Sequence, residues 1–429
     1  MIEEGEYKKR RDTFSKVLQD NSVAVLLSAE FQTRSNDTEY PYRQNSNFYY
    51  LTGFKEDNAF LVFVKVKKKL RTILFVQEKD EKMELWNGKR LGEQKAKELF
   101  MVDEVYSSKE FKTKFEEFVK DIKFIFYDFA EKYEKVKFIY TYAKQLSAYE
   151  NLAPLINKMR LIKSSTEIDC IQKAIDITQQ AHHQVICLNK IGKMEYQLQA
   201  EIEYIFKSKG AYSDAYISIV ACGNSANTLH YISNDKSLEE NELILIDAGC
   251  EYQYYASDIT RTIPVSGKFS EPQKELYEMV LDVQLQIMQL IAPKIKRSYL
   301  QKRSEELLCM GLVRLGILKG SMRKLLKEKK HKKYYPHGIG HWMGLDVHDQ
   351  APYKDEKGKE ILLQVGMLLT IEPAIYIDKD DETVPEKYRG IGIRIEDDIL
   401  VTQEGHKNLS QGIAKTIAQI EKLFDYERD

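Results

Sequence analysis

Short apolar segments alternate with charged segments along the first third of the chain. The apolar segments are rich in β-branched and aromatic side chains, which favours strands, and they cover residues 23–29, 59–66, 72–77 and 123–128. Apolar positions recur with helical spacing at residues 91–100 and 110–120. The alternation predicts a small N-terminal α/β domain.

A long amphipathic helix marks the start of a second domain. Ser164 and Glu167 have the spacing of a capping box, and the apolar residues that follow fall on one helical face. A chain of 429 residues is also too long for one ordinary core. We therefore expect two domains, residues 1–158 and residues 159–429.

The second domain combines helices with strands that run consecutively and then return late in the chain. Helical patterns lie at residues 166–190, 194–209, 271–291, 297–315 and 410–425. Strand patterns lie at residues 216–223, 242–249, 254–265, 367–377 and 390–402. This order predicts an antiparallel sheet backed by helices, so the fold class is α+β. His182 and His183 are adjacent in the first helix, and we expect them to be partly exposed and without a role.

Composition and charge narrow the class of protein. The chain has 65 basic and 66 acidic residues and a formal net charge of −1, which argues against a nucleic-acid partner. No apolar run is long enough to span a membrane, and the basic run at residues 323–333 is expected to be a solvated helix end and loop. Five scattered cysteines and a charged N-terminus predict a cytoplasmic protein without a disulfide framework.

Four acidic residues lie inside strongly apolar strand patterns, where a charge is costly without a partner. They are Asp247, Asp258, Glu372 and Glu396. The first two flank a turn sequence, which fits a hairpin, and the last two lie on strands joined by a charged connector. Any one of them could be an ordinary strand-end residue. Two strand pairs that each present two carboxylates predict an oxygen-rich cation cage.

Three histidines lie close together in the segment "YYPHGIGHWMGLDVHD", namely His337, His341 and His348. The first two have the spacing of a helical H-E-x-x-H zinc site, but Gly338 and Gly340 disfavour a helix and the glutamate is absent. We expect the glycines to let the backbone pass close to the site. One histidine would then be a nitrogen ligand, and the others would be free for substrate binding and proton transfer.

A cage of four carboxylates and one imidazole balances the charge of two divalent cations. Such a mixed oxygen and nitrogen site favours Mn²⁺, Co²⁺, Fe²⁺ or Zn²⁺. Two ions of this kind lower the pKa of a water held between them, which is the chemistry of hydrolysis. The residues therefore predict a metal-dependent hydrolase.

The order of these residues resembles that of the pita-bread metallopeptidases, and among them most closely the aminopeptidase P group. The resemblance rests on "LILIDAGCEYQYYASDITRTIPV", "HGIGHWMGLDVHD", "TIEPAIY" and "GIGIRIEDDI", with "RQNSNFYYLTGF" and "LWNGKRLG" in the N-terminal part. It implies a C-terminal pita-bread catalytic domain, a smaller N-terminal α/β domain, and removal of the N-terminal residue from peptides that have proline at position 2.

The resemblance also implies a ligand set, namely Asp247, Asp258, His341, Glu372 and Glu396. Asp258 and Glu396 would bridge two divalent ions, with Mn²⁺ the first expectation and Co²⁺ or Zn²⁺ the alternatives. Hydrolysis would proceed through a hydroxide that bridges the two ions. Glu372 would also move a proton between this water and the leaving amine.

Four further residues receive roles from the resemblance. His230 would contact the substrate near the scissile carbonyl, and His348 would stabilise the oxyanion or hold the prolyl carbonyl. His337 would line the proline pocket. Arg394, on the same strand face as Glu396, would contact the substrate.

The resemblance implies a homo-oligomer, either a dimer or a tetramer, whose partner molecule is a peptide rather than a nucleic acid or a membrane. Trp86 would either reach the active site of a neighbouring subunit or be a core residue of the small domain.

Prolidase, which cleaves only Xaa-Pro dipeptides, is the main alternative because it shares both domains and all ligands. Methionine aminopeptidase lacks a comparable N-terminal domain. Non-enzymatic binding modules and creatinase-like hydrolases of this fold are expected to lack metal ligands, whereas this chain has all five.

Overall fold

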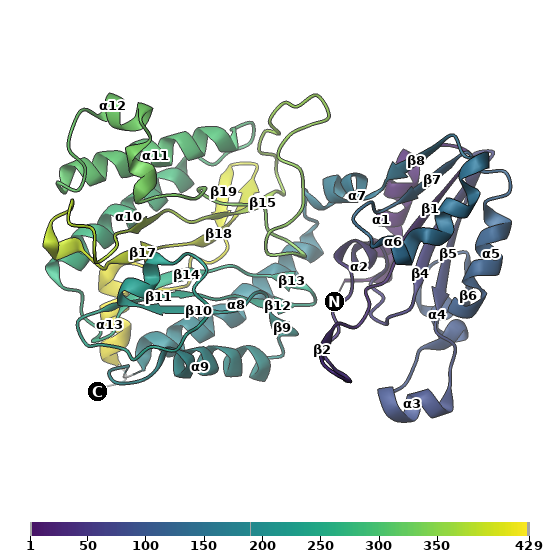
Figure 1. The fold of residues 1–429 in the computed structure, drawn as a ribbon, viewed down its shortest axis with the longest axis horizontal. Helices are drawn as coiled ribbons and strands as arrows, with labels where there is room; N and C mark the ends of the chain where they lie inside the picture. The colour runs from purple at the N-terminus through teal and green to yellow at the C-terminus, as the bar shows by residue number, and fades with distance from the viewer. Residues whose placement is uncertain (1, 189, 427–429) are drawn as a thin grey trace. The chain divides into compact units, whose positions relative to one another are not determined.

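The computed structural model of the protein describes residues 2–188 and 190–426. The chain forms two compact units, one that ends at Arg160 and one that begins at Leu161 (Figure 1). The first unit contains a six-stranded sheet and the second contains several smaller sheets, and each unit has its own buried apolar cluster.

A six-stranded mixed sheet forms the centre of the first unit, in the order β6-β5-β4-β1-β7-β8. Its strands are β1 (Ser22–Leu27), β4 (Phe60–Val66), β5 (Lys69–Val76), β6 (Glu104–Ser107), β7 (Phe124–Tyr127) and β8 (Ala148–Asn151). The four strands predicted from apolar runs are confirmed as β1, β4, β5 and β7. The pattern does not predict β6 and β8, because each has only four residues and most of them are half-buried.

Helices complete the first unit. They are α1 (Glu4–Val17), α2 (Ser46–Thr52), α3 (Glu81–Asn87), α4 (Gly92–Leu99), α5 (Phe111–Phe118), α6 (Tyr133–Val136) and α7 (Ala153–Arg160), and a small hairpin joins β2 (Thr33–Ser35) to β3 (Thr38–Glu39). The predicted helices are confirmed as α4 and α5. Helix α1 was not predicted, because its sequence is highly charged, yet one of its faces is buried. On this face Arg11 lies beside Phe14 and donates a hydrogen bond to the Leu51 carbonyl oxygen at 2.9 Å.

Trp86 lies in α3 with 77% of its surface exposed. The interpretation of Trp86 as a core residue is therefore wrong. The neighbouring Leu85 is 82% exposed, so this short helix presents apolar side chains to solvent.

The second unit surrounds antiparallel strands with long helices (Figure 1). The helices are α8 (Ser165–Cys187), α9 (Glu195–Ser208), α10 (Glu271–Gln289), α11 (Arg297–Arg314), α12 (Met322–Lys327) and α13 (Ile417–Tyr426). The strands are β9 (Ser213–Asp214), β10 (Ile219–Cys222), β11 (Leu243–Asp247), β12 (Cys250–Tyr252), β13 (Tyr255–Ala256), β14 (Thr260–Pro264), β15 (Leu368–Ile371), β16 (Ala374–Tyr376), β17 (Gly392–Arg394), β18 (Asp397–Thr402) and β19 (Gly405–Asn408). The predicted α+β class is confirmed.

Most predicted helices of this unit begin and end within a few residues of the observed ones. The last helix is an exception, because α13 begins at Ile417 rather than near residue 410. The preceding residues have another use: Ser410 is buried and its hydroxyl donates to Asp397 Oδ1 at 2.8 Å. A tertiary contact therefore keeps this segment out of the helix.

The prediction that His182 is partly exposed is wrong. His182 is only 1% exposed, and its Nε2 lies 3.2 Å from the Ala248 carbonyl oxygen. Burial lowers the pKa of His182 to about 3, with a further contribution from the positive charge of Arg261. His183 is half-buried and accepts a hydrogen bond from the Ala414 backbone amide.

Within residues 2–188 and 190–426, no helix combines the length and the apolar character needed to cross a bilayer.

Candidate metal centre

Asp247 and Asp258 reach the site from a hairpin, as the sequence predicts. Strands β11 and β14 are antiparallel neighbours in a register that pairs Asp247 with Thr260. The chain between them forms the β12–β13 hairpin, whose turn residues Gln253 and Tyr254 have positive φ values of 53° and 67°, as expected for a tight hairpin turn.

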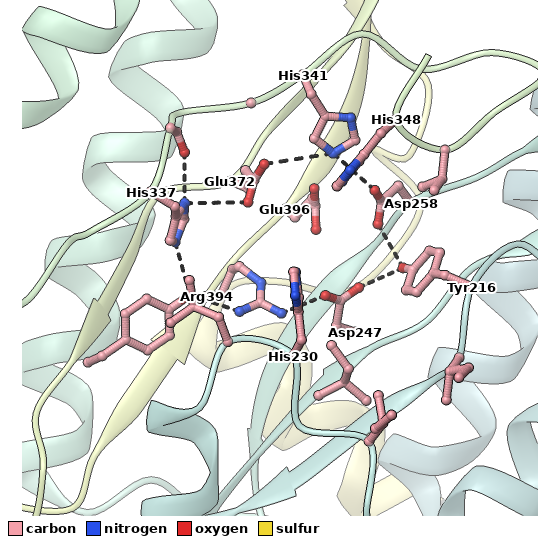
Figure 2. A pocket seen from close by; sticks show the side chains of 18 of the residues that line it. Tyr216, His230, Asp247, Asp258, His337, His341, His348, Glu372, Arg394 and Glu396 are labelled. Carbon is pink, nitrogen blue, oxygen red and sulfur yellow. Dashed lines mark hydrogen bonds and ion pairs between the residues drawn. The ribbon is translucent and has the colours of Figure 1, made fainter. Parts of the chain in front are cut away.

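The hydroxyl of Tyr216 lies between these two carboxylates, at 2.6 Å from Asp247 Oδ1 and 2.7 Å from Asp258 Oδ1 (Figure 2). A phenol has only one hydrogen to donate. It can therefore donate to only one of the two carboxylates at a time. Nothing in the local sequence around Tyr216 indicates this role.

Glu372 and Glu396 reach the site from two interrupted strands. Glu372 and Pro373 separate β15 from β16, and Ile395 and Glu396 separate β17 from β18. The two interruptions face each other, because β15 pairs with β18 and β16 pairs with β17. The sequence predicts each strand as continuous, and the breaks occur where the carboxylates turn into the cavity.

His341 is oriented by its neighbours on the adjacent backbone. Its amide donates to Thr370 Oγ1 at 3.1 Å, and its carbonyl accepts from the Thr370 amide at 3.0 Å. A Cβ on Gly340 would lie 1.9 Å from the Thr370 carbonyl oxygen. The predicted role of the glycines is therefore confirmed for Gly340, whereas a Cβ on Gly338 would meet nothing closer than 3.7 Å.

The tautomer of His341 follows from its hydrogen bond. Its Nδ1 lies 3.1 Å from the Trp342 carbonyl oxygen, which can only accept, so Nδ1 carries the proton in the neutral ring. The Nε2 lone pair then faces Asp258 Oδ2 at 3.3 Å and Glu372 Oε1 at 3.8 Å. This is the arrangement that metal-binding histidines require.

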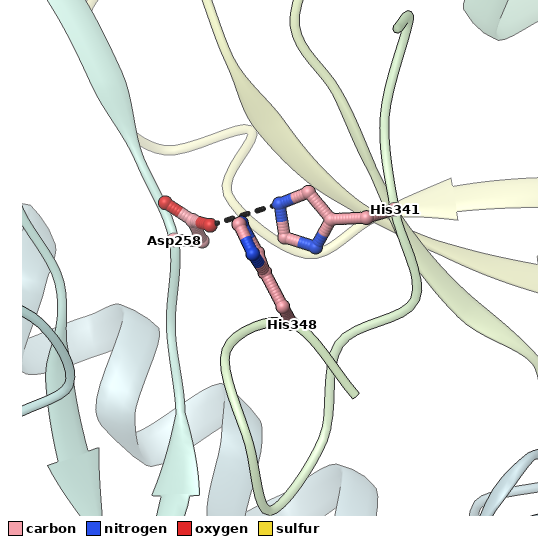
Figure 3. Close-up of side chains that lie close together, drawn as sticks. All are labelled: Asp258, His341 and His348. Carbon is pink, nitrogen blue, oxygen red and sulfur yellow. Dashed lines mark ion pairs between the residues drawn. The ribbon is translucent and has the colours of Figure 1, made fainter. Parts of the chain in front are cut away.

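The other predicted histidines line the same cavity, which has a volume of about 450 Å³. His348 packs edge-on against His341, with ring centroids 4.1 Å apart (Figure 3). His337 Nε2 lies 3.0 Å from the Tyr376 hydroxyl, and its Nδ1 lies 3.6 Å from Glu372 Oε2. His230 is exposed at the edge of the cavity.

Arg394 donates hydrogen bonds to one carboxylate of the site and to two hydroxyl groups beside it. Its guanidinium donates to Asp247 Oδ2 at 2.5 Å, to the Tyr376 hydroxyl at 2.8 Å and to Thr260 Oγ1 at 3.1 Å. Thr260 Oγ1 also donates to Glu396 Oε2 at 2.8 Å. Arg394 and Glu396 therefore share one face, as predicted. Tyr376 is a residue that sequence reasoning missed, although the strand alternation Glu372, Ala374, Tyr376 could have indicated it.

The electrostatics of the cluster fit cations. Burial, together with repulsion from the neighbouring carboxylates, raises the pKa of Glu396 well above its usual range and that of Glu372 to about 7. Burial opposes protonation of His341, but the adjacent Asp258 and Glu372 carboxylates raise its pKa to about 9. These carboxylates cannot all be ionised together without added positive charge, which divalent cations would supply.

The ligand atoms fall into three overlapping groups within 4.8 Å of one another. Two of them are Asp247–Asp258–Glu396 and His341–Glu372–Glu396, which share Glu396. The third is Asp258–His341–His348 (Figure 3). Asp258, Glu396 and His341 each belong to two groups. A carboxylate has two oxygens and can serve two ions, whereas the His341 imidazole has one free lone pair and can serve one. His348 is a further candidate ligand beyond the predicted five.

Comparisons with known proteins decide the family. Residues 169–403 match the model of metallopeptidase family M24, and residues 7–126 match the N-terminal domain of aminopeptidase P. The chain belongs to metallopeptidase family M24. The predicted resemblance is thereby confirmed, and the N-terminal match sets this M24 peptidase apart from members without that domain.

Similar proteins extend over nearly the full length of the M24 chain. It is 40% identical to the Xaa-Pro aminopeptidase of Haemophilus influenzae, over 98% of this chain and 97% of the relative. It is 38% identical to the Escherichia coli Xaa-Pro aminopeptidase, over 99% and 98%. A solved structure of zinc-substituted Escherichia coli aminopeptidase P with product matches with a TM-score of 0.96 at 36% identity, covering 100% of this chain and 99% of that one.

Proposed function

We propose that this cavity hydrolyses the N-terminal Xaa-Pro bond of peptides with two divalent cations held by Asp247, Asp258, His341, Glu372 and Glu396. The observation that carries the proposal is that two carboxylates, Asp258 and Glu396, each belong to two of the three candidate ligand groups; His341 also does, but its ring has only one nitrogen free for an ion. Two cations, when bound, acidify a water held between them and polarise the scissile carbonyl. The mixed carboxylate and imidazole set favours Mn²⁺, with Co²⁺ or Zn²⁺ as alternatives.

Glu372 is proposed as the residue that moves the proton. It is the carboxylate that faces both His341 and His337, at 3.8 Å and 3.6 Å. A carboxylate in this position can take a proton from the attacking water and deliver it to the prolyl nitrogen as the bond breaks.

The other polar residues are proposed to bind the substrate. His230 would contact the substrate near the scissile carbonyl, and His348 would donate to the developing oxyanion or to the prolyl carbonyl. His337, ordered by Tyr376, would line the proline pocket. Arg394 already uses its guanidinium on Asp247, Tyr376 and Thr260, so its contribution to substrate binding would act largely through these partners.

Proline at position 2 suits such a site. An Xaa-Pro bond has no N–H and its ring fixes the backbone, so recognition cannot use a hydrogen bond from that nitrogen. Shape and contacts to carbonyl groups remain. The cavity offers apolar side chains such as Ile217, Leu229 and Ile232 beside the histidines.

Related proteins support the substrate class. A solved structure at 37% identity and a TM-score of 0.96 is aminopeptidase P from Escherichia coli with the inhibitor Pro-Leu. A homo-oligomer, dimer or tetramer, and a cytoplasmic location complete the proposal, as does a functional division into residues 1–158 and residues 159–429. None of the five cysteines is in a disulfide in the described part of the chain, which agrees with a reducing compartment.

Prolidase is the alternative that shares this centre. The test uses metal-stripped protein reconstituted with Mn²⁺ and compares hydrolysis of Xaa-Pro, Xaa-Pro-Yaa and longer peptides. Turnover of tripeptides and longer substrates, absent in Glu372→Ala, is the expected result. Activity restricted to dipeptides would assign prolidase, and no turnover with any divalent cation would contradict the proposal.

A further inference from the structure

Arg297 lines the same cavity as the metal centre and has no place in the proposed reaction. It is the first residue of α11 and is half-buried. One helical turn further on, Gln301 Oε1 accepts a hydrogen bond from the Ile339 amide at 2.6 Å. The start of α11 is therefore anchored to the backbone segment that carries His337 and His341.

An aromatic pair positions the guanidinium of Arg297. Its Cζ lies 4.5 Å from the centroid of the Tyr353 ring. Tyr353 in turn stacks on Trp342, with ring centroids 5.5 Å apart and an interplanar angle of 17°, and Trp342 is 99% buried next to His341. Stacking on the Tyr353 ring orients the guanidinium. Its N–H groups lie in the guanidinium plane, so they remain available to donate hydrogen bonds to a ligand.

The charge of Arg297 is not compensated within the described part of the chain. None of the carboxylates in residues 2–188 and 190–426 forms an ion pair with it at 4.0 Å or less. Glu360, from a segment outside α11, contacts the first turn of this helix and accepts from the Ser298 amide at 2.6 Å and from the Ser298 hydroxyl at 2.5 Å. Arg297 thus stays available to a ligand in the cavity.

The cavity lining holds two arginines, and they differ in their partners. Arg394 is paired with Asp247 at 2.5 Å, whereas Arg297 has no carboxylate within 4.0 Å among the described residues. If the proposed function holds, the four carboxylates of the lining hold the two divalent cations, so none of them is left to pair with Arg297. The N-terminal residue of a peptide carries an ammonium group, which the Arg297 guanidinium would repel. Arg297 is therefore better placed to face the other end of the substrate.

We infer that Arg297, held by Tyr353, binds a carboxylate on the leaving-group side of the scissile Xaa-Pro bond. This inference rests on the proposed function, because it takes the orientation of the peptide from it. The carboxylate can come from two sources, the C-terminus of an Xaa-Pro-Yaa tripeptide or an aspartate or glutamate side chain at position 3. Both present two oxygens that a guanidinium fork can bind.

The test compares Mn²⁺-reconstituted protein on three matched substrates, Ala-Pro-Ala, Ala-Pro-Ala-amide and Ala-Pro-Asp-amide. For the wild type we expect kcat/KM for the tripeptide acid to exceed that for its amide by about tenfold, the typical effect of one charge-assisted hydrogen bond. In Arg297→Gln the ratio should fall to near one, mainly through KM. Arg297→Lys keeps the charge without the fork and should give an intermediate ratio.

A matched control lies on the same helix. Arg303 pairs with Glu306 at 3.0 Å and does not line the cavity, so Arg303→Gln should leave the acid-to-amide ratio unchanged. A second readout avoids turnover: inhibition by the dipeptide Pro-Ala should weaken in Arg297→Gln relative to inhibition by Pro-Ala-amide.

Each outcome has a defined meaning. If Ala-Pro-Asp-amide is preferred over Ala-Pro-Ala-amide but Ala-Pro-Ala is not, the carboxylate comes from the side chain at position 3. If only Ala-Pro-Ala is preferred over its amide, the carboxylate is the C-terminus. Equal effects of Arg297→Gln on acids and amides would overturn the inference. Absence of hydrolysis of all three substrates by the wild type would instead contradict the proposed function.

Discussion

Glu396 and Asp397 are adjacent, both are buried, and their surroundings are opposite. Successive residues of an extended strand point to opposite faces. Glu396 faces Asp247, Asp258 and Glu372, and burial together with repulsion from these carboxylates raises its pKa well above the usual range. Asp397 faces away from this cavity towards Arg261 and Lys415.

The negative charge of Asp397 is compensated by side chains of the same protein. Arg261 Nη2 lies 2.7 Å away, Lys415 forms a second ion pair, and Ser410 and Asn408 donate hydrogen bonds at 2.8 Å and 3.0 Å. Burial opposes ionisation of Asp397, but Arg261 and Lys415 outweigh this effect and hold its pKa below the usual range. One buried carboxylate cluster is thus complete within the chain, while the other needs cations from outside. The balance of charge, rather than burial, separates a structural ion pair from a cation site.

The largest expected effect is the loss of activity on substitution of Glu396. Glu396→Gln removes a carboxylate that belongs to two ligand groups, so we expect kcat/KM to fall on the order of 1000-fold, since cations supply several kcal/mol of transition-state stabilisation. The melting temperature of the metal-free protein should not fall, because the variant relieves repulsion. Kinetics with Mn²⁺ and thermal unfolding measure the two quantities. Normal turnover by the variant would remove Glu396 from the centre.

The opposite result is expected for Asp397→Asn. It leaves Arg261 buried without its main counter-charge, which costs about 3–5 kcal/mol of the free energy of unfolding. Urea denaturation of the metal-free protein measures the loss. The double variant Arg261→Met/Asp397→Leu removes the Arg261–Asp397 pair but leaves Lys415 without Asp397, so it should recover only part of that stability. If the single variant were as stable as the wild type, Asp397 would not be held as a compensated structural pair.

Cation binding should stabilise only a chain with an intact ligand set. At a Mn²⁺ concentration of about 100 times Kd, one site raises the free energy of unfolding by about 2.7 kcal/mol. We expect an increase of this size for the metal-free wild type and for Asp397→Asn, and little or none for Asp258→Asn. Titration followed by thermal unfolding gives the comparison. Equal stabilisation of all three proteins would place the cations elsewhere.

The smallest expected effect concerns pH. The pKa of Glu372 is raised from 4.5 to about 7 in the metal-free fold, so its contribution favours folding below pH 4.5 and is lost as the pH rises through 7. Lowering the pH from 7.5 to 5.5 should therefore stabilise the metal-free wild type relative to Glu372→Gln by about 2 kcal/mol.

His182 acts in the opposite direction over the same range. Its pKa is lowered to about 3, so its contribution is present above pH 6.5 and is lost on acidification. Both proteins share this effect, and it cancels in the difference. Urea denaturation at the two pH values gives the measurement, and an unchanged difference would mean that Glu372 does not titrate with a raised pKa.

Sequence pattern predicted the strands and the site residues unevenly. The apolar runs that contain Asp258, Glu372 and Glu396 predict strands correctly, but each run is broken in the fold near its acidic residue. The spacing of apolar residues indicates which residues are buried. This spacing is the same for one continuous strand and for two strands separated by a short irregular break. Elements stabilised by distant partners were also missed, including the amphipathic α1 and the irregular segment at Ser410.

By itself, the sequence determined the α+β class, the division of the pattern into two parts, and the acidic and histidine residues that line the cavity. These are encoded locally, in the spacing of apolar residues and in charges where charges are costly. Only the tertiary structure decided which charged side chains form ion pairs. Asp397 pairs with Arg261 and Asp247 pairs with Arg394, whereas Arg297 pairs with none of the described carboxylates. It also brought Tyr216 between Asp247 and Asp258. Compensation of a charge depends on distances of a few ångströms between residues far apart in the chain, and local sequence patterns carry no information about those distances.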